Sequence, residues 1–153
     1  MKVTLITVGT LKNREIRELC DEYVKRLGPL LDFRMIEVKP EPFYSEKDHD
    51  LAKKREWERI EHSLAKLTSD VVYLMAEDGF QTPSVDFASK ALLPYAHVVF
   101  IVGGALGWPH DLSVSYRRIS LSKMTFPHEI ARLVLIEQIY RAAMINSNKR
   151  YNY

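Results

Sequence analysis

Short runs of apolar and β-branched residues alternate along this chain with segments of helical pattern. The strand-like runs are residues 2–8, 33–38, 71–75, 97–102 and 117–121. The helix-like segments are residues 14–27, 45–67, 83–93, 111–116 and 128–144. The first run is nearly all apolar or β-branched and the fourth is apolar apart from its first residue, which is typical of parallel strands covered on both faces. Strands that alternate with helices predict an α/β sandwich with a mostly parallel sheet.

With 153 residues the chain is long enough for one domain with its own core and too short for two, so we expect a single domain over residues 1–153. No apolar run approaches the roughly 20 residues of a membrane span. The apolar start reads as a strand rather than a signal segment. Cys20 lies in step with the apolar residues of a helix, so we expect a core thiol. A single cysteine allows no internal disulfide, which favours a cytoplasmic protein.

The segment from His128 to about Met144 contains no glycine or proline and predicts a long helix, with Pro127 in its first turn. Its apolar residues are spread around most of the circumference, which is typical of a helix buried on nearly all sides. Glu137 and Arg141 are spaced for an ion pair. Because a small domain does not easily cover such a helix alone, we expect part of it to meet a second subunit in a homodimer.

Positive charge is concentrated in the C-terminal quarter of the chain. Residues 117–153 contain 7 lysines and arginines against 2 acidic residues, whereas residues 1–116 contain 15 against 18. Aromatic residues lie among the basic ones. This pattern favours an anionic partner such as RNA. A solvated basic tail explains the same charges, so both interpretations stay open here.

Ligands of parallel sheets bind beyond the carboxyl ends of the strands. Three predicted loops end there, at residues 75–79, 103–107 and 121–126. Gly103 and Gly104 allow the backbone to approach a ligand closely, although an ordinary strand-to-helix turn accounts for them equally well. The third loop offers backbone donors and acceptors among apolar side chains, which suits a flat purine. His128 either caps the last helix or contacts a ligand.

Several other chemistries have no support in the sequence. There is no Walker A pattern and no Gly-x-Ser-x-Gly elbow. The five histidines are scattered and the cysteine is alone, so no set of residues has metal-ligand spacing and we expect no metal site.

Three segments stand in a fixed order. They are Phe-Ile-Val-Gly-Gly-Ala-Leu-Gly at 100–107, Leu-Ser-Lys-Met-Thr-Phe-Pro-His at 121–128, and Glu-Gln-Ile-Tyr-Arg-Ala at 137–142, with Arg132 before the last. In this combination, and over essentially its whole length, the chain resembles the bacterial ribosomal RNA large subunit methyltransferase H family. The resemblance implies a SPOUT-class α/β fold with a C-terminal trefoil knot. It also implies a homodimer that uses S-adenosylmethionine to methylate N3 of a pseudouridine in a 23S rRNA stem-loop on the ribosome.

The resemblance further implies roles for individual residues. The cofactor contacts fall on Leu74, Met75, Gly103, Leu121, Ser122, Lys123, Met124, Thr125 and Phe126. The catalytic candidates are Tyr151, His128 and Asn152. The candidate RNA contacts are Arg132, Lys149 and Arg150.

The chain departs from the family at its last residues. The family usually ends in Tyr-His followed by a basic residue, whereas this chain has Tyr151-Asn152-Tyr153. Asparagine cannot take a proton near neutral pH, although it can hydrogen-bond a base edge or a phosphate. The proton on N3 therefore passes to water, to His128 or to a tail group. The missing histidine favours one alternative, a non-catalytic RNA-binding or ribosome-binding module. The α/β pattern alone also allows a flavodoxin-like nucleotide-binding domain.

Overall fold

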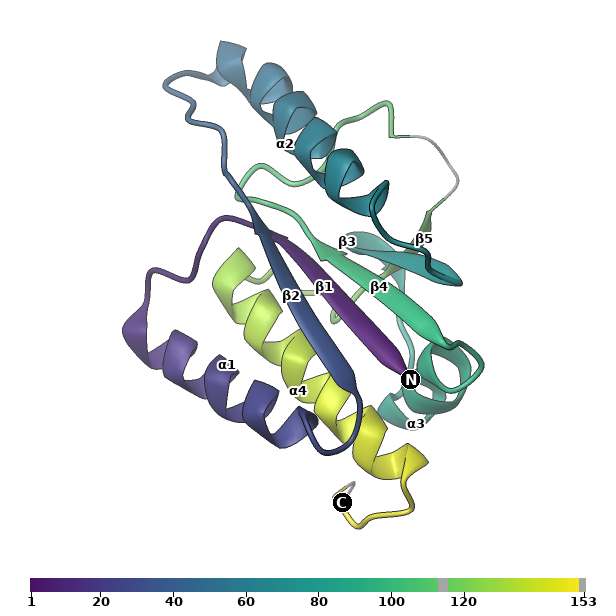
Figure 1. Cartoon of the computed structure of the whole chain (residues 1–153). Helices are drawn as coiled ribbons and strands as arrows, with labels where there is room; N and C mark the ends of the chain where they lie inside the picture. Colours follow the sequence, from purple (N-terminus) through teal and green to yellow (C-terminus); the bar gives the residue numbers. More distant parts are fainter. Residues whose placement is uncertain (113–115, 152–153) are drawn as a thin grey trace.

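The computed structural model describes residues 1–112 and 116–151 (Figure 1). Within these residues, five parallel strands form one sheet in the order β2-β1-β4-β3-β5. The strands are β1 (Lys2–Val8), β2 (Asp32–Val38), β3 (Val71–Phe80), β4 (His97–Val102) and β5 (Arg117–Ile119). The helices are α1 (Arg14–Leu27), α2 (His49–Leu64), α3 (Ser84–Asp86) and α4 (His128–Asn146), with a 3-10 turn η1 (Glu46–Asp48) and a π-helical segment η2 (Phe87–Leu92). The predicted α/β class with a parallel sheet is confirmed.

Helices cover both faces of the sheet. Figure 1 shows α1 and α4 side by side on one face and α2 on the other. In β1, Val3 and Leu5 join the apolar cluster beneath α1 and α4, whereas Ile6 and Val8 join the cluster that contains Ile60 of α2. Because successive side chains of a strand point to opposite faces, a strand covered on both faces carries apolar residues on each of them, and in β1 Thr4 and Thr7 are buried as well.

Helix α1 begins and ends where the sequence predicts. The Asn13 side chain accepts a hydrogen bond from the backbone N–H of Ile16 at 2.9 Å, which caps the first turn. The helix ends at Leu27, before Gly28. Cys20 has no exposed surface, and burial raises the pKa of its thiol to about 11. The expectation of a core thiol is confirmed.

The end of β3 corrects a prediction. Residues 77–79 do not form a turn, because β3 continues to Phe80 with a change of register against β5 after Met75. Gly79 lies directly against the backbone of β5. A Cβ atom at this position would be 2.5 Å from the carbonyl carbon of Ile119. Gly79 therefore allows the backbones of β3 and β5, which are far apart in the sequence, to approach each other closely.

We expect Gly79→Ala to lower the free energy of unfolding by about 2–3 kcal/mol, because the added methyl group must displace the β5 backbone. Chemical denaturation measures this change. Gly28→Ala is the matched control, since Gly28 has an ordinary helical φ of −49° and the nearest atom to a Cβ there would be 3.5 Å away. The control should leave stability unchanged or raise it by up to about 1 kcal/mol. Equal midpoints for the two variants would contradict the close approach.

Several element boundaries differ from the prediction. The segment expected as one α-helix over 83–93 is α3 followed by the π-helical η2, and Pro83 rather than Thr82 precedes it as the capping residue. The helix expected over 45–67 is η1 followed by α2, and β5 ends at Ile119. The short helix expected at 111–116 includes residues 113–115, which lie outside the described residues.

Helix α4 confirms the prediction of burial on nearly all sides. Every residue of His128–Asn146 is buried or half-buried within the single chain. The helix begins at His128, so Pro127 is the capping residue rather than part of the first turn. Glu137 and Arg141 form the expected ion pair at 2.6 Å. Among the described residues, the helices are all too short or too polar to cross a bilayer.

Candidate functional site

Three segments line one cleft beside the carboxyl end of β4: residues 75–78, which are strand rather than the predicted loop, and the two predicted loops after β4 and before α4. The cleft has a volume of about 1040 Å³. Its walls come from residues 75–78, residues 102–110, most of residues 118–128, and Ala131. The parallel register of β3 and β4 brings the first two segments together, because Met75 pairs with Val102. A concave, partly apolar site at this edge of the sheet is the expected place for a ligand.

Most of the predicted cofactor contacts lie in this cleft. The residues that line it are Met75, Gly103, Leu121, Ser122, Met124, Thr125 and Phe126, together with the catalytic candidate His128. Leu74 does not line the cleft, since its side chain points into the core beneath α2 and is 1% exposed. Lys123 is exposed and is also absent from the lining.

Side chains from other parts of the fold lie close to both glycines of the loop after β4. A Cβ on Gly103 would be 3.3 Å from the ring of Trp108. A Cβ on Gly104 would be 2.8 Å from Oε2 of Glu56, which reaches the loop from α2. Glu56 is 6% exposed, and burial raises the pKa of its carboxyl group, which also accepts a hydrogen bond from the backbone N–H of Glu41 at 3.0 Å.

The loop between β5 and α4 is held by short local hydrogen bonds. The Ser120 hydroxyl donates to the carbonyl of Ser122 at 2.6 Å, and the backbone N–H of Met124 donates to the Ser122 hydroxyl at 3.0 Å. These bonds use side chains to fix the turn geometry of a loop that lines the cleft.

Trp108 is a residue of the cleft that the sequence analysis missed. Its indole N–H donates to the backbone carbonyl of Met75 at 3.1 Å, and its ring packs against Gly103. The only signal in the sequence is its position next to a glycine-rich loop, because its partners are far away along the chain.

Arg132, a predicted RNA contact, lies inside the fold of the single chain rather than on its surface, since its side chain is 1% exposed. The guanidinium forms an ion pair with Glu37 at 2.6 Å and donates to the backbone carbonyl of Gly9 at 2.7 Å. It therefore ties the N-terminal part of α4 to β2 and to the loop after β1.

The C-terminal tail folds back on α4 rather than on the cleft. The Tyr151 hydroxyl donates to Glu137 at 3.3 Å, and the guanidinium of Arg141 lies 4.9 Å from the centre of the Tyr151 ring. Glu137 is nine residues after His128, so its helix position is roughly 14 Å further along the axis. One chain thus does not bring the candidates Tyr151 and His128 together.

Two further tail residues, Lys149 and Arg150, are exposed as the RNA-binding prediction requires. Asn152 lies outside the described residues. Burial raises the pKa of Tyr151 well above its usual range, and hydrogen bonding with Tyr23 adds to this shift. The phenol therefore stays protonated at neutral pH.

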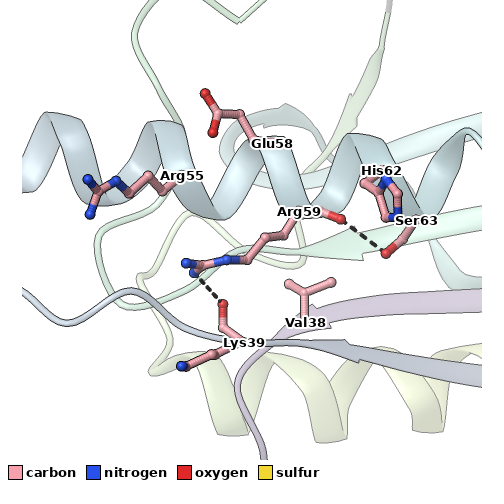
Figure 2. Close-up of a pocket in the computed structure, with 7 residues that line it drawn as sticks. All are labelled: Val38, Lys39, Arg55, Glu58, Arg59, His62 and Ser63. Atoms are coloured by element: carbon pink, nitrogen blue, oxygen red, sulfur yellow. Dashed lines mark hydrogen bonds between the residues drawn. The ribbon is translucent and has the colours of Figure 1, made fainter.

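A second concavity lies between α2 and the end of β2 (Figure 2). Its volume is about 530 Å³, and its lining residues are Val38, Lys39, Arg55, Glu58, Arg59, His62 and Ser63. The charges of both arginines are already engaged, because each forms an ion pair with Glu41. Arg59 also donates to the carbonyl of Lys39 at 2.8 Å. The larger cleft, where the last part of β3 meets two predicted loops, is the better candidate for a binding site.

Comparison with known proteins identifies the family. The chain matches the family model described as predicted SPOUT methyltransferase over residues 1–152. A relative from Exiguobacterium sibiricum is 40% identical, and one from Lactococcus lactis subsp. cremoris is 38% identical. Each alignment covers 99% of this chain and 99% of the relative. Both relatives are named ribosomal RNA large subunit methyltransferase H.

A solved structure from Bacillus anthracis agrees with the fold. It aligns with a TM-score of 0.53 at 14% sequence identity and covers 99% of both chains. At this identity the likeness concerns the fold alone. The full-length family match, the close relatives and the cleft at the strand ends together show that this chain belongs to the SPOUT methyltransferase family and is an enzyme that transfers methyl groups.

Proposed function

We propose that this protein is a homodimeric, cytoplasmic enzyme that transfers the methyl group of S-adenosylmethionine to N3 of a pseudouridine in a 23S rRNA stem-loop on the ribosome. The observation that carries the proposal is the meeting of the last part of β3 with two loops in one cleft, in a chain whose relatives are named ribosomal RNA methyltransferases. We also propose that the segment leading into α4 is threaded as a trefoil knot.

The cleft has the properties that this methyl donor needs. Its volume of about 1040 Å³ is at the upper end of the range for small-molecule sites. Gly103 allows close approach of backbone, and apolar side chains such as Leu121 and Phe126 offer surface for a purine. We assign donor binding to Met75, Gly103 and the loop 121–126, with Leu74 supporting Met75 from the core and Lys123 at the exposed rim.

Methyl transfer requires the protein mainly to position the methyl donor and the nucleophile. When bound, the sulfonium supplies an electrophilic methyl group whose transfer leaves a neutral thioether. Holding the nucleophile in line with that group lowers the barrier by up to roughly 7–11 kcal/mol in ideal cases. The proton of N3–H passes to His128, which lines the cleft, or to water. The Tyr151 hydroxyl already donates to Glu137, so Tyr151 positions the substrate by stacking of its ring or by accepting a hydrogen bond.

A dimer can bring together a tail and a cleft that lie far apart in one chain. Tyr151 lies far along α4 from its own cleft, so we propose that the tail serves the cleft of a second subunit. Half-buried apolar residues of α4 that lie outside the apolar core, such as Ile130 and Val134, provide surface for this contact. Light scattering at micromolar concentration tests the association, and a monomeric mass would contradict it.

Removal of residues 149–153 should leave donor binding unchanged and abolish most RNA methylation. The truncation deletes Tyr151 and the exposed cations Lys149 and Arg150, but no residue that lines the cleft. Calorimetry with S-adenosylmethionine and transfer of labelled methyl groups to ribosomes measure the two effects separately. Full activity of the truncated enzyme would contradict the proposed role of the tail.

Mixed dimers test whether the tail acts on the partner's cleft. One subunit carries the truncation and the other carries Gly103→Val with an intact tail. If the tail acts across the dimer, each mixed dimer keeps one complete site and recovers activity that neither homodimer has. If the tail acts within its own chain, the mixture stays inactive.

The overall test uses ribosomes from a strain that lacks the modification. We expect binding heat with S-adenosylmethionine and transfer of labelled methyl to N3 of a pseudouridine in 23S rRNA. Binding of the donor without transfer would support a non-catalytic module instead. Absence of binding heat at millimolar donor would contradict the donor assignment.

A further inference from the structure

The indole of Trp108 covers the ends of two neighbouring strands at the wall of the cleft. Its N–H donates to the carbonyl of Met75, the last residue of β3 that pairs with β4, at 3.1 Å. A Cβ on Gly103, directly after β4, would be 3.3–3.4 Å from three atoms of the six-membered ring. We assign binding of the methyl donor to Met75 and Gly103, and Trp108 lines the same cleft.

The ring is also held by aromatic packing against α2. Trp108 and Trp57 of α2 lie with ring centres 5.9 Å apart and planes perpendicular. Trp57 in turn packs at 5.4 Å against Tyr116. A half-buried indole held by one hydrogen bond and by aromatic contacts loses little conformational freedom when a ligand binds. The wall that it forms is therefore present before the donor arrives.

We propose that Trp108 is a specificity-determining residue whose indole stacks on the purine ring of the methyl donor. This inference rests on the proposed function and adds a contact that the family resemblance does not supply. Aromatic side chains bind nucleobases by stacking with little dependence on hydrogen bonds. The Trp108 N–H already donates to the Met75 carbonyl. The purine is therefore recognised at this wall by the flat face of the indole ring rather than by that carbonyl.

Fluorescence identifies the contact, because the chain has two tryptophans. Trp57→Phe leaves Trp108 as the only indole, and Trp108→Phe leaves Trp57. Each variant is titrated with S-adenosylmethionine, S-adenosylhomocysteine and adenosine, with excitation where tyrosine does not absorb. We expect all three ligands to quench the emission of the wild type and of Trp57→Phe. The emission of Trp108→Phe should not change.

Affinity gives the second measurement. Trp108→Leu should weaken the binding of all three ligands by the same factor, roughly 10-fold, since each contains the purine. Trp108→Phe retains a smaller ring, should lose less, and serves as the test if the leucine variant does not fold by circular dichroism. Trp57→Phe is the matched control and should stay within about twofold of the wild type, because Trp57 does not line the cleft.

Each other result overturns the inference. A loss confined to S-adenosylmethionine would mean that the indole contacts the sulfonium rather than the purine. Tighter binding by Trp108→Leu would mean that the indole occupies the place of the ligand. Wild-type binding heat with no response of Trp108 would overturn the stacking contact alone, whereas no binding heat in any variant would overturn the donor assignment as well.

Discussion

Arg132→Ala should lower the free energy of unfolding by about 3 kcal/mol, among the largest effects of any single substitution in this chain. The Arg132 side chain is 1% exposed and joins three parts of the fold, namely α4, Glu37 of β2 and the carbonyl of Gly9. Truncation removes two charge-assisted hydrogen bonds and leaves a cavity beneath α4. Chemical denaturation measures the loss.

A second arginine provides the control for this experiment. Arg14 forms an ion pair with Glu18 at 2.8 Å, but the two side chains are 83% and 62% exposed. Because exposed pairs contribute little, Arg14→Ala should change stability by no more than about 0.5 kcal/mol. Equal losses for the two variants would show that burial of Arg132 contributes nothing. Retention of full stability by Arg132→Ala would return this residue to the candidates for RNA binding.

Gly103→Val should weaken binding of S-adenosylmethionine by roughly 100-fold, which corresponds to the upper end of the overpacking cost of about 1–3 kcal/mol. The valine Cβ would be 3.3 Å from Trp108, and its two methyl groups would enter the cleft or push the indole aside. Methylation should fall with binding. Calorimetry and labelled-methyl transfer measure the two effects.

The position of Gly103 predicts that the fold survives this substitution. The nearest atoms to the added Cβ belong to a side chain rather than to backbone. Thermal unfolding should therefore stay close to that of the wild type, in contrast to Gly79→Ala, where the nearest atoms are the β5 backbone. Gly28→Ala, remote from the cleft lining, should bind the donor with unchanged affinity. Unchanged affinity of Gly103→Val would mean that the donor binds elsewhere.

Some features of the site left a signal in the sequence that only becomes clear with the fold. Arg132 is spaced three, four and seven residues before Leu135, Ile136 and Ile139, all of which are buried. A basic residue on the most buried side of a helix points to a structural ion pair rather than to a surface contact. The partner, Glu37, is 95 residues away, so no local pattern identifies it.

The sequence by itself determined the alternation of strands and helices and the positions of several of these elements. Apolar periodicity, the Asn13 cap and the absence of helix breakers after Pro127 act through neighbouring residues, and so β1, α1, β4 and α4 lie where the residues predict. The convergence of residues 75–78, 102–110 and 118–128 at one cleft also followed, because parallel strands place their carboxyl-terminal parts on one edge.

The tertiary structure alone decided which polar groups are buried and which residues meet. It turned the expected loop at 77–79 into strand, buried Arg132, brought Trp108 onto Met75 and Gly103, and placed Tyr151 far from His128 in the same chain. Each of these outcomes depends on contacts between segments distant in the sequence. Such contacts are set by packing and strand register, and neither property is encoded in any short stretch of residues.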